Sequence, residues 1–259
     1  MQSNVPSTRS HDVNAPEVHR GSVPRHVAIV MDGNGRWAKK RFMPRVFGHK
    51  QGVDALVRTV FACADRGIEY LTVFAFSSEN WKRPTEEVSG LMGLVLVAVS
   101  KYLAKMAGDG VRIRIVGDRS QVSEKLRAAW EQAESSTRNN SRITLSVAFN
   151  YGGRWDVVQA CRQVIAAGIP ADELDEATLN RYMALSYAPD PDLFIRTGGE
   201  VRISNFLLWQ AAYSELVFTD CLWPEFGEAE LDAALAQYAA RERRFGTVPV
   251  LPDFVANGV

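Results

Sequence analysis

Short and mostly uncharged apolar runs recur along this chain, and a segment with helical periodicity follows most of them. Runs of this length with few charges on either face are typical of strands that are buried on both sides of a parallel sheet. Strands that alternate with helices predict an α/β fold, in which helices cover a mostly parallel central sheet of about six strands. The expected strands are 27–31, 70–76, 111–116, 142–150, 192–196 and 216–218.

Helical periodicity predicts the segments that cover this sheet, and a basic loop is expected at 39–48. The helix expected at 85–106 is unusual because its middle is apolar on more than one face. Such a helix is either buried on all sides or turns one apolar face to a cavity, and periodicity alone leaves both open. The other expected helices are 49–67, 120–139, 155–167, 172–185, 205–212 and 228–244.

Length and composition favour a single globular domain. The chain has 259 residues and is 46% hydrophobic, which is enough for one sizeable core. We expect a disordered tail at 1–24, one domain at 25–246 and a C-terminal tail at 247–259. The segment 1–24 has no apolar signal core, and the longest uncharged apolar stretch, 88–100, is too short to span a bilayer.

Charge and cysteine content exclude further classes of protein. Thirty basic and thirty acidic residues give a net charge of zero, which argues against a general nucleic-acid-binding protein. The three cysteines, Cys63, Cys161 and Cys221, are far apart and fit neither a disulfide framework nor a metal motif. We expect reduced, mostly buried thiols in a cytoplasmic protein.

The segment 26–37 joins an apolar run to unusual polar chemistry. Asp32 comes directly after the first expected strand, and Gly-Asn-Gly-Arg follows it. Glycines let backbone amides approach an anion, and the chain from 33 to 53 has six Lys or Arg residues and no acid. A carboxylate beside bare amides and cations indicates a divalent metal held against phosphate groups. An ordinary turn with a solvated basic face has the same composition.

Two nucleotide-binding motifs come close to this pattern but fail. Gly33-x-Gly35-x-x-Ala38 matches the dinucleotide fingerprint, which also needs an acidic residue at the end of the next strand. Asp54 has the right spacing but lies in a helical pattern, while the next strand ends near Phe76. The sequence also lacks a P-loop motif. A dinucleotide-dependent oxidoreductase is therefore the weaker alternative.

Four expected strands end in polar groups. The segments are Asp32-Gly-Asn-Gly-Arg, Ser77-Ser-Glu-Asn-Trp, Asn150-Tyr-Gly-Gly-Arg and Arg196-Thr-Gly-Gly-Glu. The carboxyl ends of parallel strands meet at one edge of a sheet, where α/β folds bind ligands. Arginine donors suit phosphate oxygens, so two clusters predict two phosphorylated groups or one large one. The clusters are Arg36, Arg45 and His49, and Arg196, Arg202 and Ser204.

Seven segments match the motifs of a known family, in the family's order. They are 26–38 (HVAIVMDGNGRWA), 76–81 (FSSENW), 150–154 (NYGGR), 192–200 (DLFIRTGGE), 202–210 (RISNFLLWQ), 213–216 (YSEL) and 243–246 (RRFG). Over about 24–246 the chain closely resembles the cis-prenyltransferases, in particular the bacterial members that make undecaprenyl diphosphate. The chain has no Asp-Asp-x-x-Asp, the metal motif of the all-helical trans-prenyltransferases.

The resemblance implies an enzyme that condenses isopentenyl diphosphate with an allylic diphosphate, such as farnesyl diphosphate, and forms cis double bonds. It implies Mg2+, a homodimer and an apolar tunnel with the helix at 85–106 as one wall. The implied product is undecaprenyl diphosphate, a precursor of the lipid carrier for cell-wall glycans, and a lipid product implies work near a membrane. A short-chain synthase and a non-catalytic partner subunit of the same fold stay open as alternatives.

The resemblance also implies a role for each matching residue. Asp32 corresponds to a catalytic Mg2+ ligand, Glu215 to a second metal ligand, and Asn80 to the position often assigned as proton acceptor. A neutral amide is a poor base, so we expect Asn80 to orient the substrate while a diphosphate oxygen takes the proton. The implied donor contacts are Gly33, Asn34, Gly35, Arg36, Trp37, Arg45 and His49. The implied acceptor contacts are Arg196, Arg202, Ile203 and Ser204, and the loop that closes over substrates comprises Ser77, Ser78, Glu79, Trp81 and Arg83.

Three further positions complete the comparison. Arg244 and Gly246 match a C-terminal motif that reaches the partner subunit's active site in this family. Val201 stands where many relatives have His, and a valine cannot bind a metal. We expect a modest effect of Val201, because Asp32 and Glu215 are both present.

Overall fold

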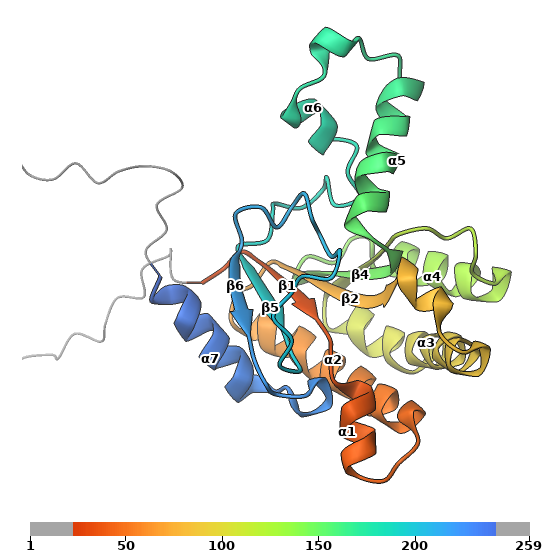
Figure 1. Cartoon of the computed structure of the whole chain (residues 1–259), viewed down its shortest axis with the longest axis vertical. Coiled ribbons are helices and arrows are strands. Elements are labelled where there is room, and N and C mark those ends of the chain that lie inside the picture. Colours follow the sequence, from red (N-terminus) through yellow and green to blue (C-terminus); the bar gives the residue numbers. More distant parts are fainter. Residues whose placement is uncertain (1–22, 242–259) are drawn as a thin grey trace, which may run out of the picture.

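A parallel sheet of six strands forms the centre of the molecule (Figure 1). The computed structural model describes residues 23–241, so nearly all of both predicted tails lies outside the described residues. The strand order is β3-β4-β2-β1-β5-β6, and every pair of neighbouring strands is parallel. The strands are β1 His26–Val30, β2 Tyr70–Ser77, β3 Val111–Val116, β4 Ile143–Tyr151, β5 Leu193–Arg196 and β6 Glu215–Phe218. The predicted α/β fold is confirmed.

Helices cover one face of this sheet, and turns at 184–187 and 203–211, with the start of one further helix, cover the other. Within the described chain the helices are α1 Asn34–Lys40, α2 Arg45–Asp65, α3 Thr85–Gly108, α4 Glu124–Thr137, α5 Gly153–Ala166, α6 Glu176–Asn180 and α7 Glu228–Ala239. Short 3-10 helices are η1 Ser78–Lys82, η2 Ala171–Glu173 and η3 Trp223–Glu225. Helices α5 and α6 extend from one end of the molecule, and α1 with the loop after it extends at the opposite end (Figure 1).

The core lies on both faces of β1, which is why each of its five residues is buried. The larger core packs buried side chains of α2, α4 and α7 against the sheet and includes the fully buried Trp130 of α4. The smaller core lies on the opposite face, where Phe74 stacks on Phe206 with ring centroids 4.5 Å apart. Burial on both faces explains the uncharged runs that mark the central strands in the sequence.

The predicted basic loop at 39–48 is wrong at both ends. Helix α1 extends to Lys40 and α2 begins at Arg45, so only four residues connect them. Pro44 adopts a φ of −56° as the N-cap of α2, which sets the helix start earlier than the apolar periodicity indicates. Helix α7 is also shorter than predicted, since it ends at Ala239.

Two predicted helices are replaced by turns. At 172–185 only α6 is an α-helix, and the residues after it form successive turns, such as the one closed by Tyr182 N–H on the Leu179 carbonyl oxygen at 2.9 Å. At 205–212 no helix forms, because Asn205 and Leu207 have φ values of 62° and 48°. Such left-handed residues cannot be part of a right-handed helix.

Helix α3 encloses an apolar cavity together with α2, α4 and the sheet. Only Val88 and Met106 of α3 are buried, so the alternative of a fully buried helix is wrong. The cavity has a volume of about 170 Å³. The residues of α3 that line it are Leu91, Leu94, Val95, Ala98, Val99, Tyr102, Leu103 and Met106. One face of α3 thus lines a cavity, while a continuous tunnel stays a prediction.

Length and composition alone would also let α3 cross a membrane, since an 18-residue window of this helix has a mean hydropathy of 1.5. The sequence prediction of no membrane span considered only the uncharged stretch 88–100, which is shorter than this 18-residue window. A single helix of this kind is weak evidence for a membrane span, because helices that pack within a domain often have the same composition. Here many of its apolar side chains face the cavity.

The buried His26 links the stability of the core to pH. Its Nδ1 lies 2.6 Å from the Pro189 carbonyl oxygen and its Nε2 lies 2.8 Å from Thr72 Oγ1. A carbonyl oxygen can only accept, so Nδ1 donates and Nε2 accepts from the threonine in the neutral ring. Burial disfavours the charged imidazole and lowers the pKa of His26 from 6.5 to about 4.

Lowering the pH is therefore expected to weaken folding through His26. The unfolded chain binds this proton near pH 6.5 and the folded chain only near pH 4. The contribution of His26 to the free energy of unfolding is complete above pH 6.5 and is lost as the pH falls to 4, about 3 kcal/mol in total. Urea denaturation across this range should show a shallower loss for His26→Gln than for the wild type. Parallel pH dependences of the two proteins would contradict the role of His26.

Candidate active site

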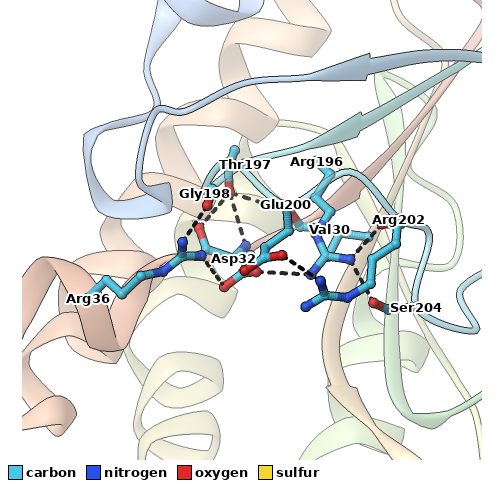
Figure 2. Close-up of polar contacts among 9 residues, drawn as sticks. All are labelled: Val30, Asp32, Arg36, Arg196, Thr197, Gly198, Glu200, Arg202 and Ser204. Atoms are coloured by element: carbon cyan, nitrogen blue, oxygen red, sulfur yellow. Dashed lines mark hydrogen bonds and ion pairs between the residues drawn. The ribbon is translucent and has the colours of Figure 1, made fainter.

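The carboxyl ends of β1 and β5 bring Asp32 and Arg196 together (Figure 2). Val30 of β1 lies opposite Arg196 of β5 in a parallel pair, so the residues that follow both strands emerge at the same edge of the sheet. Arg196 Nη2 lies 3.0 Å from Asp32 Oδ2. The predicted meeting of strand ends is confirmed for these two strands.

The Asp32 carboxylate is held between two arginines (Figure 2). Arg36 Nη2 lies 3.1 Å from Oδ1, while Arg196 occupies Oδ2. Burial by itself would raise the pKa of Asp32, but hydrogen bonds and charge from Arg196 and Arg36 hold this pKa below its usual value. Thr197 fixes the backbone here, because its Oγ1 donates to the Asp32 carbonyl at 2.7 Å and accepts from the Asp32 N–H at 3.0 Å. Asp32 is therefore an ionised and oriented carboxylate at neutral pH.

Arg196 is the buried centre of the second predicted cluster. Its side chain is 4% exposed, and its Nη1 donates to the Arg202 carbonyl oxygen and to Ser204 Oγ, each at 2.6 Å. Its buried Nε has no hydrogen-bond partner within the described chain. The Arg202 guanidinium is 59% exposed and lies 2.5 Å from Glu200. One guanidinium is thus fixed by the fold, and the other is open to an anion from solvent.

Glycines allow the first turn of α1 to approach α2. Gly33 precedes the helix with a φ of 112°, and a Cβ there would lie 2.9 Å from Leu222. A Cβ on Gly48 would lie 2.0 Å from the Asn34 carbonyl oxygen, and one on Gly52 would lie 2.3 Å from Asn34 Oδ1. Side chains at these two positions would displace Asn34 from the cavity that it lines.

Glu87 pairs with two arginines beside His49, one from the first cluster and one from the predicted substrate loop. It lies 3.5 Å from Arg45 and 3.1 Å from Arg83. Burial, assisted by the charges of Arg83 and Arg45, lowers the pKa of His49 to about 4, so its ring is neutral at pH 7. His49 Nε2 and Asn34 Oδ1 are buried and have no hydrogen-bond partner among residues 23–241. Both residues line the cavity, so they form the polar end of an almost entirely apolar space.

The 3-10 helix η1 follows β2 in the chain and is hydrogen-bonded to the end of β4. The Ser77 N–H donates to Asn80 Oδ1 at 3.1 Å, and Trp81 Nε1 donates to Asn150 Oδ1 at 2.8 Å. Asn205 Nδ2 donates to Glu79 at 2.9 Å. The predicted substrate loop, which also includes Ser78 and Arg83, therefore lies at the same edge of the sheet as Asp32.

Two other predicted site residues, Trp37 and Ile203, lie near this edge, as does Val201, which departs from the family pattern. Trp37 packs under Arg41, whose guanidinium carbon is 4.2 Å from the ring centroid. Ile203 lies in the turn that joins Arg202 to Ser204 and accepts a hydrogen bond from the Phe206 N–H at 3.2 Å. Val201 is 74% exposed, so it contributes no ligand and no buried contact.

Glu215 is not brought to Asp32 within the chain. It is the first residue of β6 and pairs with Leu193, the first residue of β5, so it lies at the opposite edge of the sheet. Strands rise about 3.3 Å per residue, which places Glu215 at least 10 Å from the strand ends that hold Asp32. Its carboxylate pairs with Arg241 at 2.5 Å. Arg244 and Gly246, which follow Arg241 closely, lie outside the described residues.

Sequence reasoning missed four residues that organise the site: Glu87, Asn150, Thr197 and Asn205. Asn150 and Asn205 adopt positive φ values of 49° and 62°, which asparagine tolerates better than most residues. Both lie inside segments that carry the resemblance, which was the available signal. The pair of Glu87 with Arg83 has i,i+4 spacing, which is a local signal, whereas its contact with the distant Arg45 has no local sequence signature.

Guanidinium clusters beside an apolar cavity suit an enzyme that must hold a phosphorylated group and a hydrocarbon chain at once, as a prenyltransferase does. Residues 30–246 match the family model of undecaprenyl diphosphate synthases. The chain belongs to this family and is a cis-prenyltransferase.

Similar proteins cover almost the whole domain. An isoprenyl transferase of Neisseria gonorrhoeae is 56% identical over 225 residues, which are 87% of this chain and 90% of that protein. A ditrans,polycis-undecaprenyl-diphosphate synthase of Pseudomonas aeruginosa, described as specific for (2E,6E)-farnesyl diphosphate, is 54% identical over 228 residues, 86% of this chain and 91% of that protein. The crystal structure of lavandulyl diphosphate synthase from Lavandula x intermedia, in complex with dimethylallyl diphosphate, has a TM-score of 0.84 at 37% identity and covers 87% of this chain and 99% of that chain.

Proposed function

We propose that this cis-prenyltransferase extends farnesyl diphosphate with isopentenyl diphosphate units and releases undecaprenyl diphosphate, a precursor of the cell-wall lipid carrier. The observation that carries this proposal is the position of His49 and Asn34, which border both the anion-binding cluster and the apolar cavity. A diphosphate bound there would have its hydrocarbon chain beside the cavity. The printed specificity of the Pseudomonas relative supports farnesyl diphosphate as the primer. We also propose that the enzyme works in the cytoplasm beside a membrane.

The two clusters divide the substrates between them. We assign the donor diphosphate to Arg36, Arg45, His49 and the amides of 33–35, and the isopentenyl diphosphate to Arg196, Arg202 and Ser204. In the proposed reaction the donor C–O bond breaks, the isopentenyl double bond attacks the allylic carbon, and a proton leaves the new chain. The arginines stabilise charge on the departing diphosphate by donating hydrogen bonds to its oxygens.

Asp32 is the proposed Mg2+ ligand. Residues 23–241 contain no group of three His, Cys, Asp or Glu side chains that could hold a metal by themselves. Mg2+ commonly takes one or two carboxylates together with substrate phosphate oxygens and water, so a single ionised carboxylate beside an anion site fits this ion. Bound there, Mg2+ would neutralise charge on the leaving group.

Asn80 is proposed as an orienting residue. Its Oδ1 already accepts the Ser77 N–H, which leaves the amide nitrogen as the group that can contact a substrate. An amide of this kind donates well but is a poor base. We infer that a diphosphate oxygen takes the proton and that Asn80 positions the chain that loses it.

A homodimer would explain the position of Glu215. Within one chain Glu215 and Asp32 lie at opposite edges of the sheet, so a Mg2+ ion shared by both requires Glu215 from a second subunit. Glu215 pairs with Arg241, just before the C-terminal Arg244-x-Gly246 motif. We propose that this part of the chain completes the site of the partner subunit.

The decisive experiment is incubation of the purified protein with farnesyl diphosphate, labelled isopentenyl diphosphate and Mg2+, followed by sizing of the extracted products. A narrow distribution of long cis-polyprenyl products would support the proposal. Addition of a single unit would assign a short-chain synthase instead. If no allylic primer supports incorporation, the chain is a non-catalytic partner subunit.

Filling the cavity should shorten the product. Ala98 lines the cavity on α3, and Ala98→Trp is expected to shorten the main product by several isoprene units, because the growing chain would meet the new ring. The matched control is Val97→Trp, since Val97 is on the same turn but 58% exposed. Mass spectrometry of the products measures both. If Ala98→Trp leaves the product length unchanged, the cavity does not control chain length.

A further inference from the structure

The loop between α1 and α2 and the first turn of α2 lie at one end of the molecule (Figure 1). Together they carry large apolar side chains that are exposed to solvent. Phe42 is 98% exposed, and Met43, Val46 and Phe47 are between 45% and 49% exposed. We refer to these four residues as the apolar tip. Every residue from 41 to 47 is exposed, so no neighbouring segment of the described chain covers the tip. Contiguous exposed apolar residues commonly mark an interaction surface.

The backbone holds Phe42 in this exposed position. Its φ is 56°, a left-handed conformation that bulky residues rarely adopt and that glycine would suit better. The turn is closed by the Phe42 N–H on the Lys39 carbonyl oxygen at 3.1 Å and by the Met43 N–H on the Ala38 carbonyl oxygen at 3.0 Å. A strained, well-bonded turn that displays an aromatic ring to solvent suggests a functional reason for the ring.

Lysines without acidic partners surround the apolar tip. Lys39, Lys40 and Lys50 are exposed, and none has an ion pair within residues 23–241. The arginines of the same segment are neutralised locally: Arg36 by Asp32, Arg41 by Glu225 and Arg45 by Glu87. The chain from 33 to 53 has no acidic residue. The apolar tip is therefore flanked by positive charge that no acidic residue of the described structure compensates.

We propose that the apolar tip inserts into the headgroup region of an anionic lipid bilayer, with the three lysines against the lipid headgroups. Aromatic and aliphatic side chains bind at the boundary of headgroups and acyl chains, and lysines are attracted to anionic lipids. A projecting loop suits a lipid surface better than it suits a peptide, which usually binds in a groove. The choice of a lipid surface rests in part on the proposed function, since its product is a lipid.

Helix α2 connects the apolar tip to the cavity. Val46 and Phe47 lie in its first turn, and His49, Val53 and Leu56 line the cavity farther along it. A helix rises 1.5 Å per residue, so Leu56 lies only about 14 Å along the axis from Phe47. Docking through the tip would bring the donor end of the cavity close to the bilayer that receives the product.

Vesicle flotation of the full-length protein without substrates tests this proposal. We expect binding to vesicles of phosphatidylcholine mixed with phosphatidylglycerol and little binding to phosphatidylcholine alone. Phe42→Gly should lower the partition coefficient about fivefold, since it removes the most exposed apolar side chain. Lys39→Gln and Lys40→Gln should each lower it about fivefold as well. Glycine suits the left-handed backbone, so Phe42→Gly should keep the Tm of the wild type or raise it.

Matched controls use an exposed apolar residue and an exposed lysine elsewhere. Ile165→Ser on α5, where Ile165 is 76% exposed, and Lys125→Gln on α4 should leave flotation unchanged. Equal flotation of Phe42→Gly and the wild type would overturn the proposal, as would equal binding to neutral and anionic vesicles. A changed oligomeric state of Phe42→Gly with unchanged flotation would assign the tip to a second copy of the chain.

The test also separates the docking surface from the proposed reaction. Turnover measured in detergent does not depend on vesicles. Flotation without turnover would contradict the proposed reaction and support docking, whereas turnover without flotation would contradict docking alone.

Discussion

Asp32→Asn is expected to lower kcat by about a thousandfold, because the charge of one carboxylate serves several groups at once. The substitution keeps the shape of the side chain but removes the negative charge that faces Arg36 at 3.1 Å and Arg196 at 3.0 Å. It also removes the proposed ligand of Mg2+. Steady-state kinetics across a range of Mg2+ concentrations measures the effect, and added Mg2+ should not restore the rate.

The control for Asp32→Asn is Asp220→Asn. Asp220 lies at the same rim, where its Oδ1 would be 2.8 Å from a Cβ on Gly199, and it has no ion pair in the described structure. We expect this variant to keep kcat within about threefold of the wild type. A comparable loss in both variants would show that general charge at the rim, and not the position of Asp32, supports turnover.

Arg196→Gln is expected to combine a loss of stability with a loss of substrate affinity. The buried guanidinium serves Asp32, the Arg202 carbonyl and Ser204, and all three would lose their partner. Because Asp32 is partly exposed and keeps Arg36, we expect destabilisation of about 2 kcal/mol, less than for a fully buried pair. The KM for isopentenyl diphosphate should rise at least about thirtyfold, since the proposed charge-assisted contact of Arg196 with its diphosphate would be lost. Urea denaturation and steady-state kinetics measure the two effects.

Arg202→Gln separates these effects, because the Arg202 side chain is 59% exposed and pairs only with Glu200 in the described structure. Surface pairs of this kind contribute little to stability. This variant should raise the KM for isopentenyl diphosphate and leave the free energy of unfolding almost unchanged. If it instead unfolds as readily as Arg196→Gln, the inference that Arg196 supports both folding and binding while Arg202 supports binding alone is wrong.

The strands were predictable because burial on both faces leaves a strong local signal. The strand 111–116 agrees with β3 at both ends, and the first strand differs from β1 by one residue. The failures lie where the backbone depends on contacts with distant residues. Helix α1 packs on Gly48 and Gly52 of another helix, and the turn at Asn205 contacts Glu79 across the site.

The sequence predicted which strand ends meet at the site, but not every residue that lies there. Parallel strands carry their polar ends to one edge, so the meeting of Asp32 with Arg196 follows from topology alone. The same rule could not place Glu215, which begins a strand and therefore lies at the opposite edge. Thr197 was missed because its partner Asp32 comes from a distant segment, and so was the contact of Glu87 with Arg45.

If Mg2+ binds Asp32 as proposed, the two arginines paired with this carboxylate would couple its binding to that of the diphosphate. While both carboxylate oxygens face guanidinium groups, a metal ion must compete with those groups for Asp32. An incoming diphosphate offers the arginines a replacement partner and releases the carboxylate. Each ligand would then favour binding of the other. By thermodynamic reciprocity, Mg2+ would raise the affinity for diphosphate by the same factor as diphosphate raises the affinity for Mg2+. With both carboxylate oxygens paired to arginines, we expect the proposed Mg2+ to bind weakly until a diphosphate is bound.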